Sequence, residues 1–398
     1  MALKTWLPLI GITICVFIFN MSEFMPIGLL SDMAADFGIS ESKIGLIISI
    51  YAWAVAILSL PLILVFRKME YRRLLLMCVV LFAAFQVMSG ISKSYGMLVI
   101  SRLGVAVAHS IFWSIAAALA VRVVPQGRQK LALSAVATGT SIAMIIGLPL
   151  GRVIGLALGW RMTFITIAIA SIIALMLLVA SFPKVENPGT FTLKRLPDIF
   201  CNKALVCMYI VLAFYVTGYY TGYSYIEPFL AQAGMSEIFI TLMLTLFGIA
   251  GIVGSILFTK FYDRTRFKFF LAVMIGTGIC LLLLEPATSS PLTTAVVCSV
   301  WGLCAMAFCV ISQNETIKAA PQDAVPIAMS LFSGIFNVGI AMGSIIGGAV
   351  TDSLSVSDVG YVGSAFVLIS CAILAFVLIG LIKKRESEMG KDAGDGPA

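Results

Sequence analysis

Charged residues are scarce in this chain of 398 residues. Asp, Glu, Lys and Arg make up 11% of it, whereas soluble domains contain about 25%. There is one histidine, His109, and the nine cysteines form neither a CxxC pair nor a zinc-like spacing, which argues against a metal site. A GxxxxGK[ST] phosphate-binding motif is also missing. These absences argue against a soluble enzyme and against an ATP-driven pump.

Apolar residues supply 61% of the chain, and the mean hydropathy is +1.07. Such a composition predicts that lipid surrounds most of the protein. In hydrocarbon every backbone amide must be bonded within the protein, and the alternating pattern of barrel strands is missing, so we expect helices. Twelve stretches are long enough to cross a bilayer: 6–31, 42–66, 74–92, 96–123, 131–157, 160–182, 204–230, 237–261, 268–285, 292–317, 325–351 and 359–382.

The basic residues indicate the orientation of these helices. Most of the 26 Lys and Arg residues fall in alternate connections, while the opposite connections hold only Lys43, Lys93 and Arg161. By the positive-inside rule both termini are predicted to be cytoplasmic. The formal charge of +7 is explained by these loops, and we expect no nucleic-acid partner.

The chain contains an internal repeat. Gly38-Ile39-Ser40-Glu41 aligns with Gly234-Met235-Ser236-Glu237, and at the same offset Gly147 and Gly151 align with Gly343 and Gly347. Repeated halves with a site between them are typical of secondary transporters. We therefore predict a six-helix bundle over residues 1–183, a cytoplasmic linker over 184–203, a second six-helix bundle over 204–384 and a cytoplasmic tail over 385–398.

Several motifs resemble those of a known family. Two parallel six-helix halves with a basic middle loop are similar to the major facilitator superfamily. "SRLGVAVAH" resembles the fourth-helix motif of its drug–proton antiporter branch, with Arg102 as the motif arginine. "GTSIAMIIGLPLG" resembles the fifth-helix antiporter motif, although Arg152 stands where that motif has a second terminal glycine.

Longer stretches resemble the bacterial sugar efflux transporters of the SotB type. "FNMSEFMPIGLLSD", "AHSIFWSIAAALAVR" and "SLFSGIFNVGI" carry this resemblance. It implies proton-driven export of arabinose-like sugars and thiogalactosides across the inner membrane. We accordingly expect a multi-pass monomer that uses a small-molecule substrate, protons and the lipid bilayer, with the proton gradient in place of a cofactor.

Glu23 is a carboxylate inside the first apolar stretch. A charge at the centre of a bilayer costs about 2.5–3.5 kcal/mol on insertion scales. The residue could carry the coupling proton, or it could tie two helices together. Arg102, His109 and Trp113 share one stripe of the fourth helix, and we expect Arg102 or His109 to modulate the proton affinity of Glu23. His109 could also carry the proton itself.

Polar and aromatic residues in apolar stretches are candidates for substrate contact. Tyr219 and Tyr223 lie one helical turn apart and could stack on the C–H faces of a sugar, or they could belong to an interfacial aromatic belt. Asn337 could bind a ligand or bond a neighbouring helix. The predicted substrate-binding set is Asn20, Trp113, Tyr219, Tyr223 and Asn337.

The motif glycines suggest a place where helices pack and bend. Small residues permit close helix contact, and Pro149 removes one backbone hydrogen bond. In the loop after the second stretch, Lys68 replaces the aspartate of the superfamily signature, whereas Asp263-Arg264 is kept in the second half. The predicted gating set is Gly139, Gly147, Pro149, Gly151, Asp263 and Arg264.

Two other functions compete with sugar export. The same fold could export amphipathic drugs such as chloramphenicol, which a largely aromatic cavity would favour. It could instead be a receptor or lipid scaffold that transports no sugar. The substrate, the stoichiometry and the choice between Glu23 and His109 as proton carrier are left open by the sequence.

Overall fold

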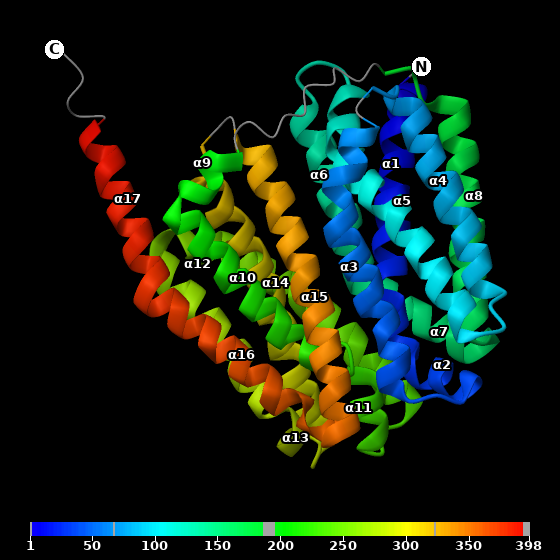
Figure 1. Cartoon of the computed structure of the whole chain (residues 1–398), viewed down its shortest axis with the longest axis vertical. Coiled ribbons are helices and arrows are strands. Elements are labelled where there is room, and N and C mark those ends of the chain that lie inside the picture. Colours follow the sequence, from blue (N-terminus) through cyan, green and yellow to red (C-terminus); the bar gives the residue numbers. More distant parts are fainter. Residues whose placement is uncertain (1, 67, 186–195, 322–323, 393–398) are drawn as a thin grey trace.

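The regular elements of the protein are helices throughout the part that the structure describes. The computed structural model describes residues 2–66, 68–185, 196–321 and 324–392, and no strand occurs among them (Figure 1). Within these ranges, eleven helical segments are long and apolar enough to cross a membrane. The chain is therefore an all-helical, multi-pass membrane protein, as its composition predicts. The predicted linker falls partly outside the described residues, as does the end of the predicted tail.

The first half of the chain forms one bundle. Its first crossing changes type near its end: the α-helix stops at Phe24, and a 3₁₀ turn containing Pro26 connects it to a short helix. A π-helical turn likewise interrupts the fifth crossing just before Pro149. The elements are α1 (Ala2–Phe24), η1 (Met25–Leu29), α2 (Leu30–Phe37), α3 (Glu41–Val65), α4 (Tyr71–Gly90), α5 (Tyr95–Arg122), α6 (Gln129–Ile142), η2 (Ala143–Gly147), α7 (Leu148–Leu158) and α8 (Trp160–Ser181).

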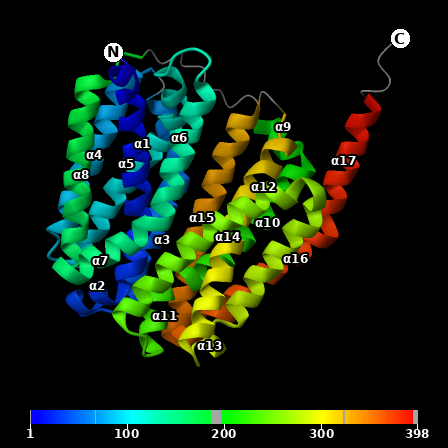
Figure 2. The ribbon, with the colours of Figure 1, turned by 180° about the vertical axis from the view of Figure 1, so that it is seen from behind.

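The second half forms another bundle beside the first (Figure 2). Its helix α9 lies within the predicted linker, and its last helix continues into the predicted tail. The elements are α9 (Leu196–Cys201), α10 (Lys203–Tyr223), α11 (Ile226–Gln232), α12 (Glu237–Leu282), α13 (Leu284–Ala287), α14 (Pro291–Ala319), α15 (Val325–Ser353), η4 (Val356–Asp358), α16 (Val359–Ile373), η5 (Leu374–Leu378) and α17 (Ile379–Asp392).

Helix α12 covers two of the predicted stretches, 237–261 and 268–285. It contains 46 residues, and Thr265 has non-helical dihedral angles (φ −135°, ψ 26°). A straight helix of that length would measure about 69 Å, more than twice the hydrocarbon thickness of a bilayer. The preceding α11 and the following α13 lie at the same end of the molecule (Figures 1 and 2). The chain therefore turns back at Thr265.

The same local geometry occurs at two sites that the internal repeat aligns. Gly38 and Gly234 both have positive φ, +62° and +78°, a conformation that glycine adopts without strain. The following Ser40 and Ser236 each cap a helix by accepting a hydrogen bond from the backbone N–H three residues on. The two halves thus use the same glycine turn and serine cap before α3 and α12.

Helix packing repeats between the halves as well. The α-hydrogens of Gly147 and Gly151, from η2 and α7, face Met21 and Met25 in the first crossing. Their counterparts Gly343 and Gly347 face Thr217 and Thr221 of α10. The offset that aligns these glycines also aligns Met21 with Thr217 and Met25 with Thr221. Close packing through glycine is therefore a property of both bundles.

The two bundles meet along α3 and α15 and diverge toward the end where α1 begins (Figures 1 and 2). We call the opposite end, which contains α2, α11 and α13, the far end. Polar contacts join the halves there, including a hydrogen bond of 3.3 Å from Ser344 Oγ to the Gly45 carbonyl. The described conformation is therefore joined at the far end and spread at the other.

Candidate functional site

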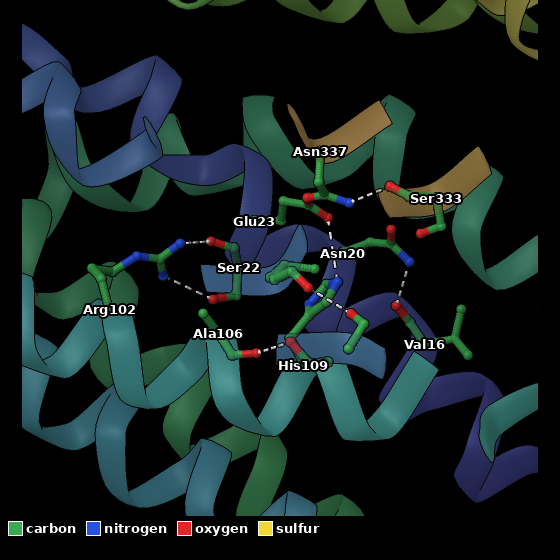
Figure 3. Close-up of polar contacts among 12 residues, drawn as sticks. Val16, Asn20, Ser22, Glu23, Arg102, Ala106, His109, Ser333 and Asn337 are labelled. Atoms are coloured by element: carbon green, nitrogen blue, oxygen red, sulfur yellow. Dashed lines mark hydrogen bonds and ion pairs between the residues drawn. The ribbon is translucent and has the colours of Figure 1, made fainter. Parts of the chain in front are cut away.

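Glu23 lies in the last turn of α1, directly before the 3₁₀ turn, and faces α5. Its Oε2 atom is 3.6 Å from Nε2 of His109 (Figure 3). The Glu23 side chain is 12% exposed and the His109 side chain 4%. A carboxylate and an imidazole at this separation can hold one proton between them, and a small movement would bring them into hydrogen-bond range. The structure thus brings His109 of α5 into contact with Glu23 of α1.

Aromatic rings surround the imidazole of His109. The ring centroids of Phe19 and Trp113 are each 6.0 Å from it, and Tyr51 meets it edge-on at 5.5 Å. Nδ1 of His109 is buried and has no hydrogen-bond partner within the described parts of the chain. Because apolar rings surround the imidazole, a positive charge on His109 depends on a charged Glu23 to balance it.

Arg102 lies beside this pair, and its guanidinium bonds Ser22 instead of Glu23. Its Nη1 donates to Ser22 Oγ (3.2 Å) and its Nη2 donates to the Ser22 carbonyl (3.1 Å), as Figure 3 shows. The guanidinium also lies over the Tyr51 ring, 4.6 Å from its centroid. Gln86 donates to the same Ser22 hydroxyl. Arg102 therefore acts on Glu23 through space, from a fixed position.

The hydroxyl of Ser22 is expected to contribute strongly to stability. In a Ser22→Ala variant the buried Arg102 and Gln86 each lose an acceptor, so the free energy of unfolding should fall by about 1–3 kcal/mol. Unfolding titrations in mixed micelles measure this. Ser114→Ala is the matched control, because Ser114 is exposed and donates to the Ser110 carbonyl of its own helix. An equal loss in both variants would contradict the assignment.

A cavity lies between the two halves beside Glu23. Its wall comes mainly from α10, α12 and α14, and Phe24, the neighbour of Glu23, closes it on the other side together with residues of η2. Tyr219 and Tyr223 line it with their rings stacked, 5.0 Å between centroids. They therefore face the cavity and do not form a lipid-facing belt. The aromatic lining includes Phe24, Tyr215, Tyr219, Tyr223, Phe247 and Phe308.

The two asparagines of the predicted binding set lie near Glu23 (Figure 3). Asn20 Nδ2 donates to the Val16 carbonyl (2.8 Å), and Asn337 Nδ2 donates to the Ser333 carbonyl (3.0 Å). Both amides are thus bonded within their own helices. Oδ1 of Asn337 is buried and has no partner among the described residues, so one hydrogen-bond acceptor of this side chain is left unused.

The predicted gating glycines lie where α6 and α7 join and pack on the first crossing. Gly139 lies against Thr13, as Gly147 lies against Met21. Pro149 has no N–H to bond the carbonyl of Ile145, and the π-helical turn η2 contains that carbonyl. A Cβ added to Gly248 of α12 would lie 2.8 Å from the same oxygen. At this bend the backbone of η2 therefore lies directly against α12 of the other half.

Asp263 and Arg264 are both exposed, next to the break at Thr265. The ion pairs close to this break are made by Arg266. Arg266 makes a forked contact with Glu315, with both N–O distances 2.6 Å, and also pairs with Glu386 at 2.5 Å. This cluster lies within the second half, and the sequence analysis did not identify it.

The sequence analysis also missed a charged cluster at the far end. Arg152, treated above only as a departure from the glycine motif, is fully buried, and its Nη1 lies 3.3 Å from Oε1 of Glu227. An arginine inside an apolar stretch was the signal that could have revealed it, since such a residue requires a partner.

The comparisons agree with this architecture. The family model described as Major Facilitator Superfamily matches residues 12–322. The chain belongs to the major facilitator superfamily. It is a multi-pass membrane transporter and not an enzyme, because that superfamily consists of transporters.

Solved structures show the same fold. A bacterial homolog of the human lysosomal transporter Spinster, in an inward-facing and occupied conformation, has a TM-score of 0.74 and 15% identity, covering 92% of this chain and 95% of that one. The same type of homolog in an inward-facing and unoccupied conformation has a TM-score of 0.77 and 13% identity, covering 96% and 98%. At this identity the likeness concerns the fold alone.

Proposed function

We propose that this transporter exports small solutes in exchange for protons by alternating access. The observation that carries the proposal is the Glu23–His109 pair, buried in one half and adjoining a cavity between the halves. A carboxylate in this position can load a proton on one side of the membrane and release it on the other. Rocking of the two bundles would expose the cavity to each side in turn.

The proposed topology has twelve crossings, because α12 turns back at Thr265 and so contributes two. Basic residues at the start of α4, the end of α14 and in α17 gather at the end where α1 begins. The positive-inside rule therefore supports cytoplasmic termini and a far end that faces outward. The sequence resemblance supports a location in the inner membrane, and we propose a monomer.

Sugars are the proposed substrates, on the basis of the resemblance to sugar efflux transporters. The stacked rings of Tyr219 and Tyr223 suit the C–H faces of a sugar, and the free Oδ1 of Asn337 could accept a hydrogen bond from a sugar hydroxyl. His109 or Glu23 would carry the competing proton, and Arg102 would tune it. Asn20 and Trp113 complete the proposed binding set.

Amphipathic compounds are a second candidate, favoured by the lining of the cavity. Apart from the tyrosine hydroxyls, the lining is almost wholly aromatic and aliphatic, whereas a sugar requires many polar partners. A ligand with a flat apolar ring and one hydrogen-bond donor would match the stacked tyrosines and Asn337. The apolar part would gain free energy by leaving water.

Proteoliposomes with an imposed pH difference test the proposal. Proton movement that depends on an arabinose-like sugar is the expected result. Movement that depends instead on an amphipathic drug would support the second candidate. Neither response, from protein shown to be folded, would contradict transport by proton exchange and favour a receptor or scaffold.

Removing the Tyr219 ring is expected to weaken substrate binding. Ring stacking contributes about 0.5–1.5 kcal/mol beyond area burial, so the Kd of a Tyr219→Ala variant should rise about tenfold. Calorimetry measures this, with Tyr361→Ala on the exposed surface of α16 as control. Tyr219→Phe separates the candidates: it should weaken binding of a sugar, which needs the hydroxyl, and spare a purely apolar ring. Unchanged binding in Tyr219→Ala would remove the residue from the site.

A further inference from the structure

Arg152 joins the two halves of the transporter at the far end. It belongs to α7 of the first half, and its side chain is 0% exposed. Nη1 donates to the Gly28 carbonyl at 2.5 Å and lies 3.3 Å from Oε1 of Glu227, while Nη2 donates to Glu237. Both carboxylates belong to the second half, on α11 and α12. One buried cation therefore binds two elements across the interface.

Glu227 makes a second contact across the same interface. Its Oε2 accepts a hydrogen bond of 3.0 Å from the backbone N–H of Ser31, in the first turn of α2. Each carboxylate oxygen thus contacts a different element of the first half. The Ser31 hydroxyl in turn donates to Glu41 at 2.6 Å, which holds the start of α2 in place.

The other acidic groups around Arg152 are closer to solvent. The Glu237 side chain is 59% exposed, and Asp32, whose charge also acts on Arg152, is partly exposed. Glu227 is 2% exposed. An ion pair screened by water contributes little, whereas removing one partner of a buried pair strands the other in low dielectric. The contact of Arg152 with Glu227 is thus more deeply buried than its contact with Glu237.

We propose that Arg152 and Glu227 form a charge lock that holds the far end closed and that must separate whenever the far end opens. The inference rests on the proposed alternating-access function. It assigns Arg152, which departs from the glycine motif, a role of its own. The lock biases the resting transporter toward a closed far end.

Distance measurements between spin labels at Lys93 and Ser289 test the lock. Both positions are exposed, and they lie in far-end loops of opposite halves. In a background without the native cysteines, Glu227→Gln keeps the side-chain shape but removes the charge. We expect the ratio of far-end-open to far-end-closed molecules to rise at least about tenfold, since Arg152 would lose its buried counter-charge.

Asp36→Asn is the matched control. Asp36 pairs with Arg161 at 2.7 Å, also near the far end, but both residues belong to the first half. This variant should leave the distance distribution unchanged. Equal lengthening in both variants, or none in Glu227→Gln, would overturn the lock.

Arg152→Lys provides a second test if Glu227→Gln does not fold. A lysine keeps the charge but lacks the fork that reaches Gly28 and Glu227 together, so partial opening is expected, and an unchanged distance would also overturn the lock. The readout is a distance and does not depend on transport. If Glu227→Gln lengthens the distance but the unmodified protein exchanges no protons, the lock is supported and only the proposed function is rejected.

Discussion

Replacing Glu23 by glutamine is expected to reduce uphill export driven by a pH difference to the leak rate of protein-free vesicles. Glutamine has nearly the shape of glutamic acid but cannot take up and release a proton. The contact with His109 at 3.6 Å would become neutral, and the packing of α1 against α5 would be kept. Flux of substrate down its own gradient should persist, because that process does not require coupling.

Two further variants make this test specific. His109→Ala should reduce coupling if the imidazole shares the proton, and it should leave coupling intact if Glu23 alone carries it. Glu285→Gln changes an exposed carboxylate that contacts Tyr361 at the far end, and export should be unaffected. Full pH-driven export in both Glu23→Gln and His109→Ala would remove the pair from the mechanism.

A side chain at Gly248 is expected to prevent the far end from closing. A Cβ atom there would lie 2.7 Å from Cα and 2.8 Å from the carbonyl oxygen of Ile145 in the opposite half. Backbone atoms cannot move aside as a flexible side chain can, so Gly248→Val should penalise the closed form by about 1–3 kcal/mol. The open form should then gain about fivefold to hundredfold in population relative to the closed form, with a corresponding loss of transport.

The distance between labels at Lys93 and Ser289 measures this effect directly. Gly96→Val is the control, since a Cβ at Gly96 meets nothing within 4 Å. The Gly248 variant should remain folded, because its clash disappears when the halves separate. Loss of folded protein in Gly248→Val, with no shift in distance, would show that the glycine serves packing alone.

Much of the fold could be predicted because local patterns specify it. Apolar stretches become helices in lipid regardless of their neighbours, and each predicted stretch is helical over most of the length that the structure describes. The repeat was visible because Gly38 and Gly234 occupy a left-handed conformation that other residues rarely adopt. The predicted gap between the stretches 237–261 and 268–285 contains Thr265, which has non-helical dihedral angles inside α12.

The candidate site was predictable only in part. Glu23 and His109 were recognisable because each is unusual within an apolar helix, and the structure brings them together. Arg102 was expected to act on Glu23, but sequence could not reveal that its guanidinium is held by Ser22. That partner is a common residue in an ordinary position, so no pattern distinguishes it.

The amino-acid sequence by itself determined that this protein is a helical membrane protein of two related halves, because hydropathy depends on residues near one another and the repeat appears when the chain is aligned with itself. Tertiary structure decided which polar groups meet. Arg152 and Glu227 are far apart in sequence, and each alone resembles a motif variation or an interfacial acid. They form a buried pair only because the two bundles close at the far end. Pairing across an interface depends on how the halves dock, which no local pattern encodes.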